Sequence, residues 1–200
     1  GTATAAFGEP LGTFGGHAGY VLAVAVGRLG DTPIAVTGGT DDLARVWDLR
    51  TRRQLAALDG HSNSVRSIAL GDHRGTPVAL TTDGGYTLRL WDLNSRRPIG
   101  TPMRTQDAYL AALGRRGDTL IAIAVGDDTD VEVWDLDTGR RIGTMTGHTG
   151  DIGSVAFTQV EGTPVAVTGG SDGTARLWNL DTLKPLGGPI RVGSGGGRAV

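Results

Sequence analysis

A histidine, a threonine and an aspartate recur together in this 200-residue sequence, and these three side-chain types could form a nucleophilic catalytic triad. The first set is His17, Thr37 and Asp41. The second set, at the same spacing, is His148, Thr168 and Asp172. Because an active site would not be copied along a scaffold at regular intervals, we interpret the recurring set as structural.

Other residues could bind a metal or a nucleotide. The histidines His17, His61 and His148 lie in different repeats, too far apart to share one ion. The acidic stretch GDDTDVE resembles a calcium loop but lacks its central Gly and closing Glu, so we expect an exposed turn. The tail GSGGGRAV lacks the strand, Lys and helix of a phosphate-binding loop. We therefore expect no metal and no cofactor.

The composition is ordinary for a globular protein, with 38% hydrophobic and 20% charged residues. The formal net charge is -2 and the basic residues are scattered, so we expect neither nucleic-acid nor membrane binding. The chain has no cysteine, which excludes disulfides and thiolate chemistry and fits either redox compartment. We expect a cytoplasmic protein.

The elements that must position the recurring side chains repeat with a constant period. The four tryptophans are Trp47, Trp91, Trp134 and Trp178, at spacings of 44, 43 and 44 residues. Each follows Val or Leu and precedes Asp or Asn. A Gly-His pair stands thirty residues before three of them, at His17, His61 and His148. Such self-similarity indicates a repeat architecture.

Each repeat contains four short apolar runs, and the third run carries the tryptophan. Gly, Asp or Asn separates the runs, which favours strands joined by tight turns. No window has the apolar period of an amphipathic helix. A single four-stranded sheet cannot bury both of its faces, so neighbouring sheets must cover one another. The sequence therefore predicts an all-β fold of stacked four-stranded antiparallel sheets.

The Gly-His and Trp-Asp pairs resemble the WD-repeat (WD40) family, in which each repeat is one blade of a β-propeller. The resemblance covers nearly the whole chain and implies one partial propeller domain over residues 1–200. The close-copied, Ala-, Gly- and Arg-rich repeats are similar to bacterial, especially actinobacterial, members. The predicted segments are about four repeats at 13–56, 57–99, 100–143 and 144–187, the end of a preceding degenerate blade at 1–12, and a last strand with the start of a further blade at 188–200.

In this family a buried hydrogen-bond network links the His, a strand Ser or Thr, an Asp in the turn before the Trp strand, and the Trp. A buried indole N–H needs an acceptor, which agrees with this role. The resemblance implies two complete networks: His17, Thr37, Asp41 and Trp47 in the first repeat, and His148, Thr168, Asp172 and Trp178 in the last.

The second repeat departs from this pattern. It has His61, Thr81 and Trp91, but Gly85 stands where the aspartate is expected. We therefore expect this blade to be held mostly by packing, because one hydrogen bond contributes only about 0.5–1.5 kcal/mol.

The third repeat departs further. It keeps Asp128 and Trp134, whereas Arg104 and Ala124 replace the His and the Thr. Since an unpaired buried carboxylate is costly, we expect Asp128 to pair with Arg104 or to reach water.

The sequence at both ends resembles parts of further blades, so we expect a piece of a longer repeat array. GTAT at the start matches GTAR at 173–176, and GRAV at the end resembles the start of a first strand. An open array exposes strand edges and blade faces. Three outcomes are consistent with this: a longer polypeptide, two copies that complete a ring, or an aggregation-prone fragment.

The resemblance implies a non-catalytic scaffold that binds other proteins or peptides through loops on one face. The residues just after the Gly-His positions vary between repeats, and Tyr and Arg among them are favoured contact residues. The alternative functions are the sensory or targeting part of a larger signalling enzyme (a kinase, protease or NTPase), or a self-assembling structural module. The candidate contact residues are Tyr20, Leu22, Ser64, Arg66, Asp107, Tyr109 and Asp151.

Overall fold

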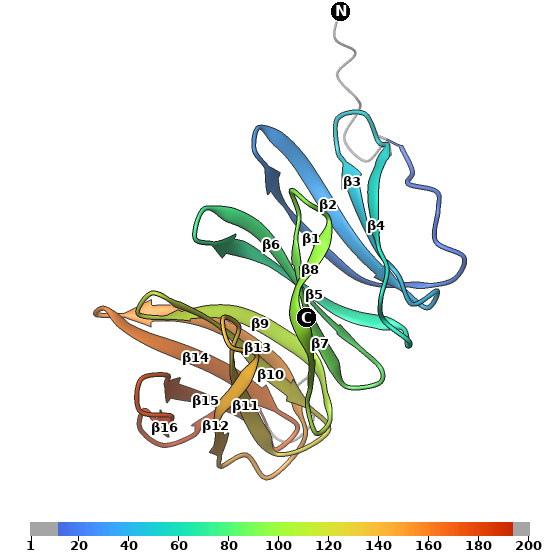
Figure 1. The fold of residues 1–200 in the computed structure, drawn as a ribbon. Coiled ribbons are helices and arrows are strands. Elements are labelled where there is room, and N and C mark those ends of the chain that lie inside the picture. The colour runs from blue at the N-terminus through green and yellow to red at the C-terminus, as the bar shows by residue number, and fades with distance from the viewer. Residues whose placement is uncertain (1–11, 194–200) are drawn as a thin grey trace, which may run out of the picture.

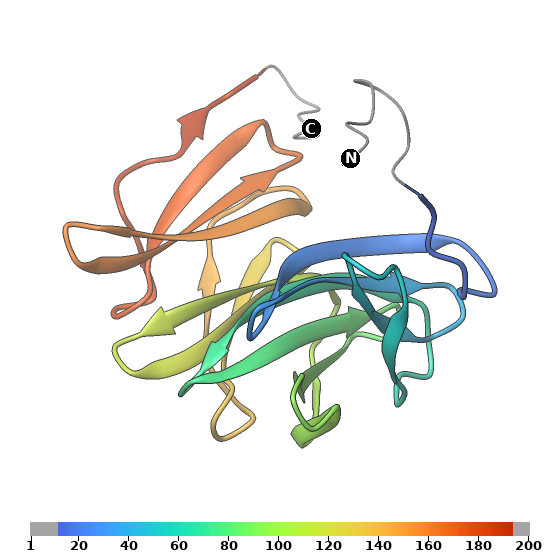
Figure 2. The ribbon, with the colours of Figure 1, turned by 90° about the horizontal axis from the view of Figure 1, so that it is seen from above.

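The computed structural model describes residues 12–193, and all regular secondary structure in this part of the chain is β-strand. Four antiparallel sheets follow one another, each with its strands in sequence order. They form an open arc, with the first sheet (blue) and the fourth (orange to red) at its ends (Figure 1, Figure 2). The predicted all-β fold is confirmed. The predicted partial blade at 1–12 lies almost wholly outside the described residues, as does the start of a further blade after 193.

The first strand of each sheet contacts the first strand of the following sheet, and these contacts join successive sheets into the arc. Successive side chains of a strand point to opposite faces, so a first strand such as β5 (Val65–His73) contacts the preceding sheet through Leu70 and the following sheet at Gly71. These strands are β1 (Val21–Leu29), β5 (Val65–His73), β9 (Ala108–Arg116) and β13 (Ile152–Val160).

The second strand of each sheet is the most buried. Its consecutive apolar and β-branched residues suit a strand that packs between two neighbouring sheets. These strands are β2 (Thr32–Gly39), β6 (Thr76–Asp83), β10 (Thr119–Gly126) and β14 (Thr163–Gly170).

The third strand of each sheet carries the tryptophan, and the residue after the tryptophan organises the following hairpin turn. Asp92 Oδ1, for example, accepts the backbone N–H groups of Asn94 and Ser95 at 2.7 and 3.1 Å. Asp48, Asp135 and Asn179 make the corresponding pairs of bonds, so this position needs a short side chain with an acceptor oxygen. The third strands are β3 (Ala44–Asp48), β7 (Thr87–Asp92), β11 (Asp130–Asp135) and β15 (Thr174–Asn179).

The fourth strand forms the outer edge of each sheet. In the fourth sheet it is divided into two short pieces on either side of Gly187, whose φ is 78°. In the first three sheets it continues a few residues past the predicted repeat ends at 56, 99 and 143. These strands are β4 (Gln54–Leu58), β8 (Arg97–Arg104), β12 (Arg140–Thr146), β16 (Lys184–Pro185) and β17 (Ile190–Arg191).

Three apolar clusters fill the spaces between successive sheets. In each cluster the tryptophan of one sheet packs against the preceding sheet, as Trp91 does with Ile34 and Val36. Trp47 has no such preceding sheet in the described residues and instead contacts Phe14, with ring centroids 5.5 Å apart. Fully burying a large apolar side chain stabilises by about 1.5–3 kcal/mol, so these clusters hold the sheets together.

In each of the first three sheets, a glycine on the first strand lies against a large side chain of the next sheet. A Cβ added at Gly27 would lie 2.9 Å from Leu70 Cδ1, and one at Gly71 would lie 2.9 Å from Leu113 Cδ1. At Gly114 the neighbouring atom is Phe157 Cδ2, at 2.7 Å. Only a residue without a Cβ allows this approach, so each glycine forms a notch for one large apolar side chain.

Candidate functional site

The recurring His, Thr, Asp and Trp meet in the first, second and fourth sheets, and we call each group of four a tetrad. In the first sheet His17 Nδ1 lies 2.7 Å from Asp41 Oδ1, and His17 Nε2 lies 2.8 Å from Thr37 Oγ1. The indole N–H of Trp47 donates to the same Thr37 oxygen at 2.7 Å. The tetrad joins the loop before β1 to β2, to the following turn and to β3.

The fourth sheet repeats this geometry. His148 lies 2.9 Å from Asp172 Oδ2 and 2.8 Å from Thr168 Oγ1, which accepts the Trp178 N–H at 2.8 Å. One proton arrangement satisfies every group in such a tetrad: the indole donates to Thr, the Thr hydroxyl donates to His Nε2, and His Nδ1–H donates to Asp. A neutral imidazole is sufficient for this arrangement.

The two turn aspartates are held as carboxylates. Burial would raise the pKa of Asp41, but hydrogen bonds from His17, the Ala18 N–H and Arg45 outweigh it and hold this pKa well below its usual range. In the fourth sheet the same balance of burial and hydrogen bonds lowers the pKa of Asp172. A carboxylate in this position therefore fixes the loop and the turn as well as the histidine.

The second sheet corrects the sequence prediction, because it contains a complete tetrad. Its carboxylate comes from Asp83, which is 1% exposed and lies 2.8 Å from His61 Nδ1. His61 Nε2 and the Trp91 N–H both bond to Thr81 Oγ1, at 2.6 and 2.8 Å. This blade is therefore not held by packing alone.

Asp83 occupies the backbone position that is glycine in the other tetrads. An added Cβ at Gly39 would lie 2.6 Å from His17 Nδ1, so this glycine leaves room for a carboxylate from the turn. In the second sheet the two residues are exchanged, with Asp83 at the strand end and Gly85 in the turn. The signal available in the sequence was TTD at 81–83 in place of TGG at 37–39 and 168–170, at the end of the second run.

The third sheet has no tetrad, and its tryptophan is satisfied differently. Trp134 donates to Glu132 Oε2 at 2.8 Å, and the other carboxylate oxygen lies 3.2 Å from Arg141 NH1. Glu132 pairs across the strands with Ala124, the residue that replaces the threonine, and so reaches the empty space. The motif EVWDL, with Glu in place of the Arg of RVWDL, was the signal for this exchange.

Of the two environments predicted for Asp128, the structure shows exposure to solvent rather than a pair with Arg104. Asp128 is exposed in the turn, where its own backbone N–H donates to the Asp107 carboxylate. Trp134 belongs to the Glu132 arrangement instead. Asp128 is therefore a turn residue rather than part of the buried network.

The order of groups in a tetrad is that of a catalytic triad, but its threonine is not placed for nucleophilic attack. Thr81 and Thr168 are 0% and 1% exposed, and each hydroxyl oxygen already accepts an indole N–H. A substrate would have to displace buried contacts to reach either oxygen. No cluster of three or more metal-ligating side chains occurs within residues 12–193. The tetrads therefore hold structure.

The exposed side chains that vary between sheets lie where the first strands begin. Each first strand has a β-bulge there, because one residue has no partner on the second strand. Bulges commonly redirect a side chain, and here the extra residue is different in every sheet. The bulge residues are Leu22, Arg66, Tyr109 and Gly153.

We use the name bulge rim for the four bulge residues and their neighbours in the adjoining turns. Every candidate contact residue from the sequence lies on it. In each of three sheets the backbone at the strand start bonds to the turn between the second and third strands, as Ser64 O does with the Gly84 N–H at 2.9 Å. The neighbours are Tyr20, Ser64, Tyr86, Asp107, Asp127 and Asp151.

A polar pocket of about 320 Å³ opens on the bulge rim between the second and third sheets. Arg66 and Tyr109 line it together with Gly84, Tyr86 and Asp127. Burial and the nearby Asp127 carboxylate raise the pKa of the Tyr109 hydroxyl. The sequence had not suggested Tyr86 or Asp127, whose approach to the pocket depends on the turns of two different sheets.

The fold and the tetrads define a repeat protein of stacked four-stranded blades. The model of the family "WD domain, G-beta repeat" matches residues 8–48, 52–92 and 139–179, which together make up more than half of the chain. The chain belongs to the WD-repeat family. The third sheet, which has no tetrad, falls largely between the matched segments.

A curated relative matches a smaller part of the chain. It is "Eukaryotic translation initiation factor 3 subunit I" from Danio rerio, 46% identical over 52 residues. The aligned part covers 26% of this chain and 15% of that protein. WD-repeat domains generally mediate protein–protein interactions and are typically non-catalytic scaffolds.

Proposed function

We propose that this chain is a non-catalytic platform that binds other proteins or peptides through the bulge rim. The observation that carries the proposal is the set of four bulges at one edge of the arc. The backbone repeats the same strand pairing and bulge in all four sheets, whereas the bulge residues are aliphatic, cationic, aromatic and glycine in turn. A rigid frame with varied side chains at equivalent exposed positions is suited to specific recognition.

The tyrosines support the same surface. The chain has three tyrosines, and Tyr20, Tyr86 and Tyr109 all belong to the bulge rim. Tyr20 is 80% exposed, an unusual setting for an aromatic side chain without a partner. Tyr and Arg are enriched among residues that dominate binding energy, and Arg66 completes the group.

The test begins with selection of binding peptides from a random-sequence display library against the immobilised chain. Dissociation constants of the selected peptides are then measured for the wild type, Arg66→Ala and Tyr109→Ala. We expect each substitution to weaken binding by about tenfold or more, because residues that dominate an interface contribute about 2 kcal/mol or more. Thermal unfolding of both variants verifies that they remain folded.

Arg74→Ala is the matched control. Arg74 lies in the turn between β5 and β6, at the end of these strands that is opposite to the bulge rim. Its side chain is 70% exposed. This variant should bind the selected peptides as the wild type does. Peptides that tolerate both rim substitutions but lose affinity for Arg74→Ala would contradict the proposal.

A further inference from the structure

The first sheet exposes an apolar face that the corresponding strands of the other sheets bury. Val21, Val24 and Val26 on β1 are 53%, 67% and 71% exposed. At the equivalent positions of β5, Val65 is fully buried and Leu70 fills the notch at Gly27. The β1 face is thus built like one half of an interface between two sheets.

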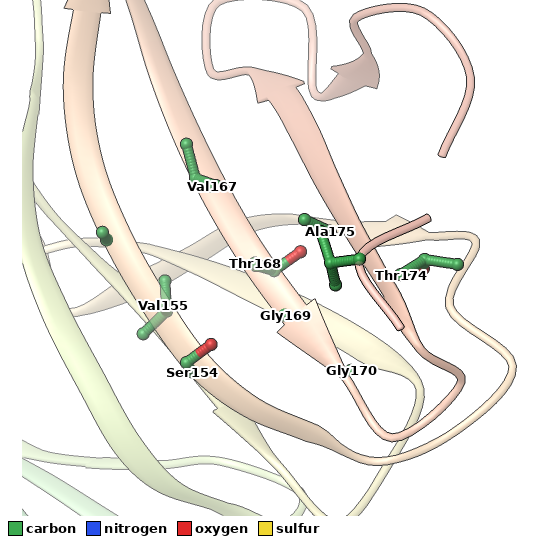
Figure 3. Close-up of a pocket in the computed structure, with 10 residues that line it drawn as sticks. Ser154, Val155, Val167, Thr168, Gly169, Gly170, Thr174 and Ala175 are labelled. Carbon is green, nitrogen blue, oxygen red and sulfur yellow. The ribbon is translucent and has the colours of Figure 1, made fainter. Parts of the chain in front are cut away.

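The fourth sheet exposes the other half. A groove of about 470 Å³ runs over β13, β14 and β15, and Figure 3 shows its floor. It is mainly apolar, and no following sheet within the described residues covers it. The residues that form its floor and edge include Ser154, Ala156, Val167, Gly169, Ala175 and Val192.

The two halves correspond at the glycine notch of the second strand. Between the first and second sheets, a Cβ added at Gly38 would lie only 2.5 Å from Val65 Cγ1. Gly169 is the equivalent of Gly38, and an added Cβ there meets only Ser154 of its own sheet. Val21 is the equivalent of Val65, so in a second copy it would lie over Gly169, beside the Ser154 hydroxyl.

A polar contact corresponds as well. The Ser67 hydroxyl oxygen lies 3.4 Å from Ala111 O and 3.3 Å from Ala111 N, which joins the second sheet to the third. Ser154 is the equivalent of Ser67 and lines the groove. Val24 is the equivalent of Ala111, so its backbone would present the same donor and acceptor to Ser154.

A third pair of equivalent positions differs in the sizes of both side chains, in opposite directions. The notch glycines Gly27, Gly71 and Gly114 are replaced by Thr158 in the fourth sheet. The side chain that would lie against it is Val26, which is smaller than the Leu and Phe that fill the other notches. A larger floor and a smaller inserted side chain together keep the volume close to that of the internal interfaces.

We propose that two copies of this chain associate head to tail, with the β1 face of each copy seated in the β13–β15 groove of the other. The result is a closed ring of eight sheets. Such a pairing joins two different surfaces of the same chain, and it forms a ring when the rotation closes. Eight blades is within the range known for propellers.

The first test is the solution mass measured by light scattering after size exclusion. We expect twice the chain mass of 20.6 kDa for the wild type. Val24→Asp should give a monomer with unchanged secondary structure, since this side chain is exposed in the single chain. Leu186→Asp is the control, because Leu186 is also an exposed apolar residue but does not line the groove. That variant should remain a dimer.

The second test uses engineered cysteines, because the chain has none of its own. Within the chain, a Cβ at Gly27 would lie 3.8 Å from Leu70 Cβ, and disulfides require about 3.5–4.5 Å. Gly27→Cys with Leu70→Cys is therefore the internal positive control. Val26→Cys protein mixed with Thr158→Cys protein should form a disulfide-linked pair under mild oxidation.

Each outcome decides the proposal. A linked pair in the mixture, with neither single variant linking to itself and a wild-type dimer, supports the ring. Self-linking of Val26→Cys would show two β1 faces in contact and would overturn it. A wild-type monomer, or a ladder of larger species, would overturn it as well and would leave these faces to other occupants.

Discussion

A single buried carboxylate connects three parts of a sheet. Asp172 accepts hydrogen bonds from His148, the Thr149 N–H and both the N–H and hydroxyl of Thr174. Its loss would leave these donors without a partner. Asp128, in the corresponding turn of the third sheet, is exposed and holds no such set.

We therefore predict that Asp172→Ala lowers the free energy of unfolding by about 1–3 kcal/mol, because buried and partly buried donors lose their acceptor. Asp128→Ala should change it by less than about 0.5 kcal/mol, as for an ordinary surface substitution. Urea unfolding midpoints of the two variants measure the difference. Equal shifts of the two midpoints would show that the tetrad carboxylate has no special role.

Two tetrad aspartates and one tetrad histidine make the free energy of unfolding depend on pH. The pKa values of Asp41 and Asp172 are depressed from 3.8, so their contribution is present above that value and is lost as the pH falls below it. Burial lowers the pKa of His61 from 6.5, so in mild acid the unfolded chain takes up a proton that the folded chain does not. This term also reduces stability as the pH falls below 6.5.

We predict that the urea midpoint decreases as the pH is lowered through 6.5 and decreases again below 3.8. Circular dichroism across a pH series measures both steps. The first step should be smaller in a variant in which His61 is replaced by a residue that does not titrate. A midpoint that rises as the pH falls through 6.5 would contradict the assignment of a buried neutral histidine.

At the scale of the strand and its turn, the second sheet shows that two backbone positions can supply the same carboxylate. The first and fourth sheets have glycine at the strand end and aspartate in the turn, whereas the second has Asp83 at the strand end and Gly85 in the turn. Both arrangements place a carboxylate oxygen within 2.9 Å of the histidine Nδ1. The two sites should therefore be exchangeable within one sheet.

We predict that Asp83→Gly lowers the unfolding free energy by about 2–3 kcal/mol and that adding Gly85→Asp restores most of it. Gly85 does not have a positive φ, so aspartate can adopt its backbone conformation. Denaturant unfolding of wild type, both single variants and the double variant measures the coupling. If the two effects simply add, the exchange of positions is not equivalent.

Much of the strand organisation follows from sequence, because four apolar runs with a constant tryptophan period leave little choice of register. Glu132 and Asp83 were not predicted, for a physical reason. A hydrogen bond depends on the position of the side-chain oxygen and not on the backbone position that carries it. Asp83 and Glu132 place their oxygens beside His61 and Trp134 from backbone positions that differ from those of the other sheets. The bulge residue Tyr109 was predicted as a contact residue, whereas Tyr86 depends on how two sheets approach each other and has no sequence period.

At the scale of the whole molecule, each sheet has two unlike faces. One face presents large side chains such as Leu70, and the other presents a notch such as Gly27. Sheets can therefore follow one another in only one direction, which produces an arc with unlike ends. The exposed valines of β1 and the groove over β13–β15 are those two ends.

The tetrads have one more consequence, for how such a chain can change its length. Every tetrad is closed within its own sheet, from the loop before the first strand to the tryptophan of the third. A duplication or deletion of one whole unit would cut contacts between sheets but would leave every tetrad intact. The third sheet has no tetrad, and the tetrads of the other three sheets are nevertheless complete. Duplication and deletion of whole repeats are therefore both compatible with hydrogen bonds that are confined to single sheets.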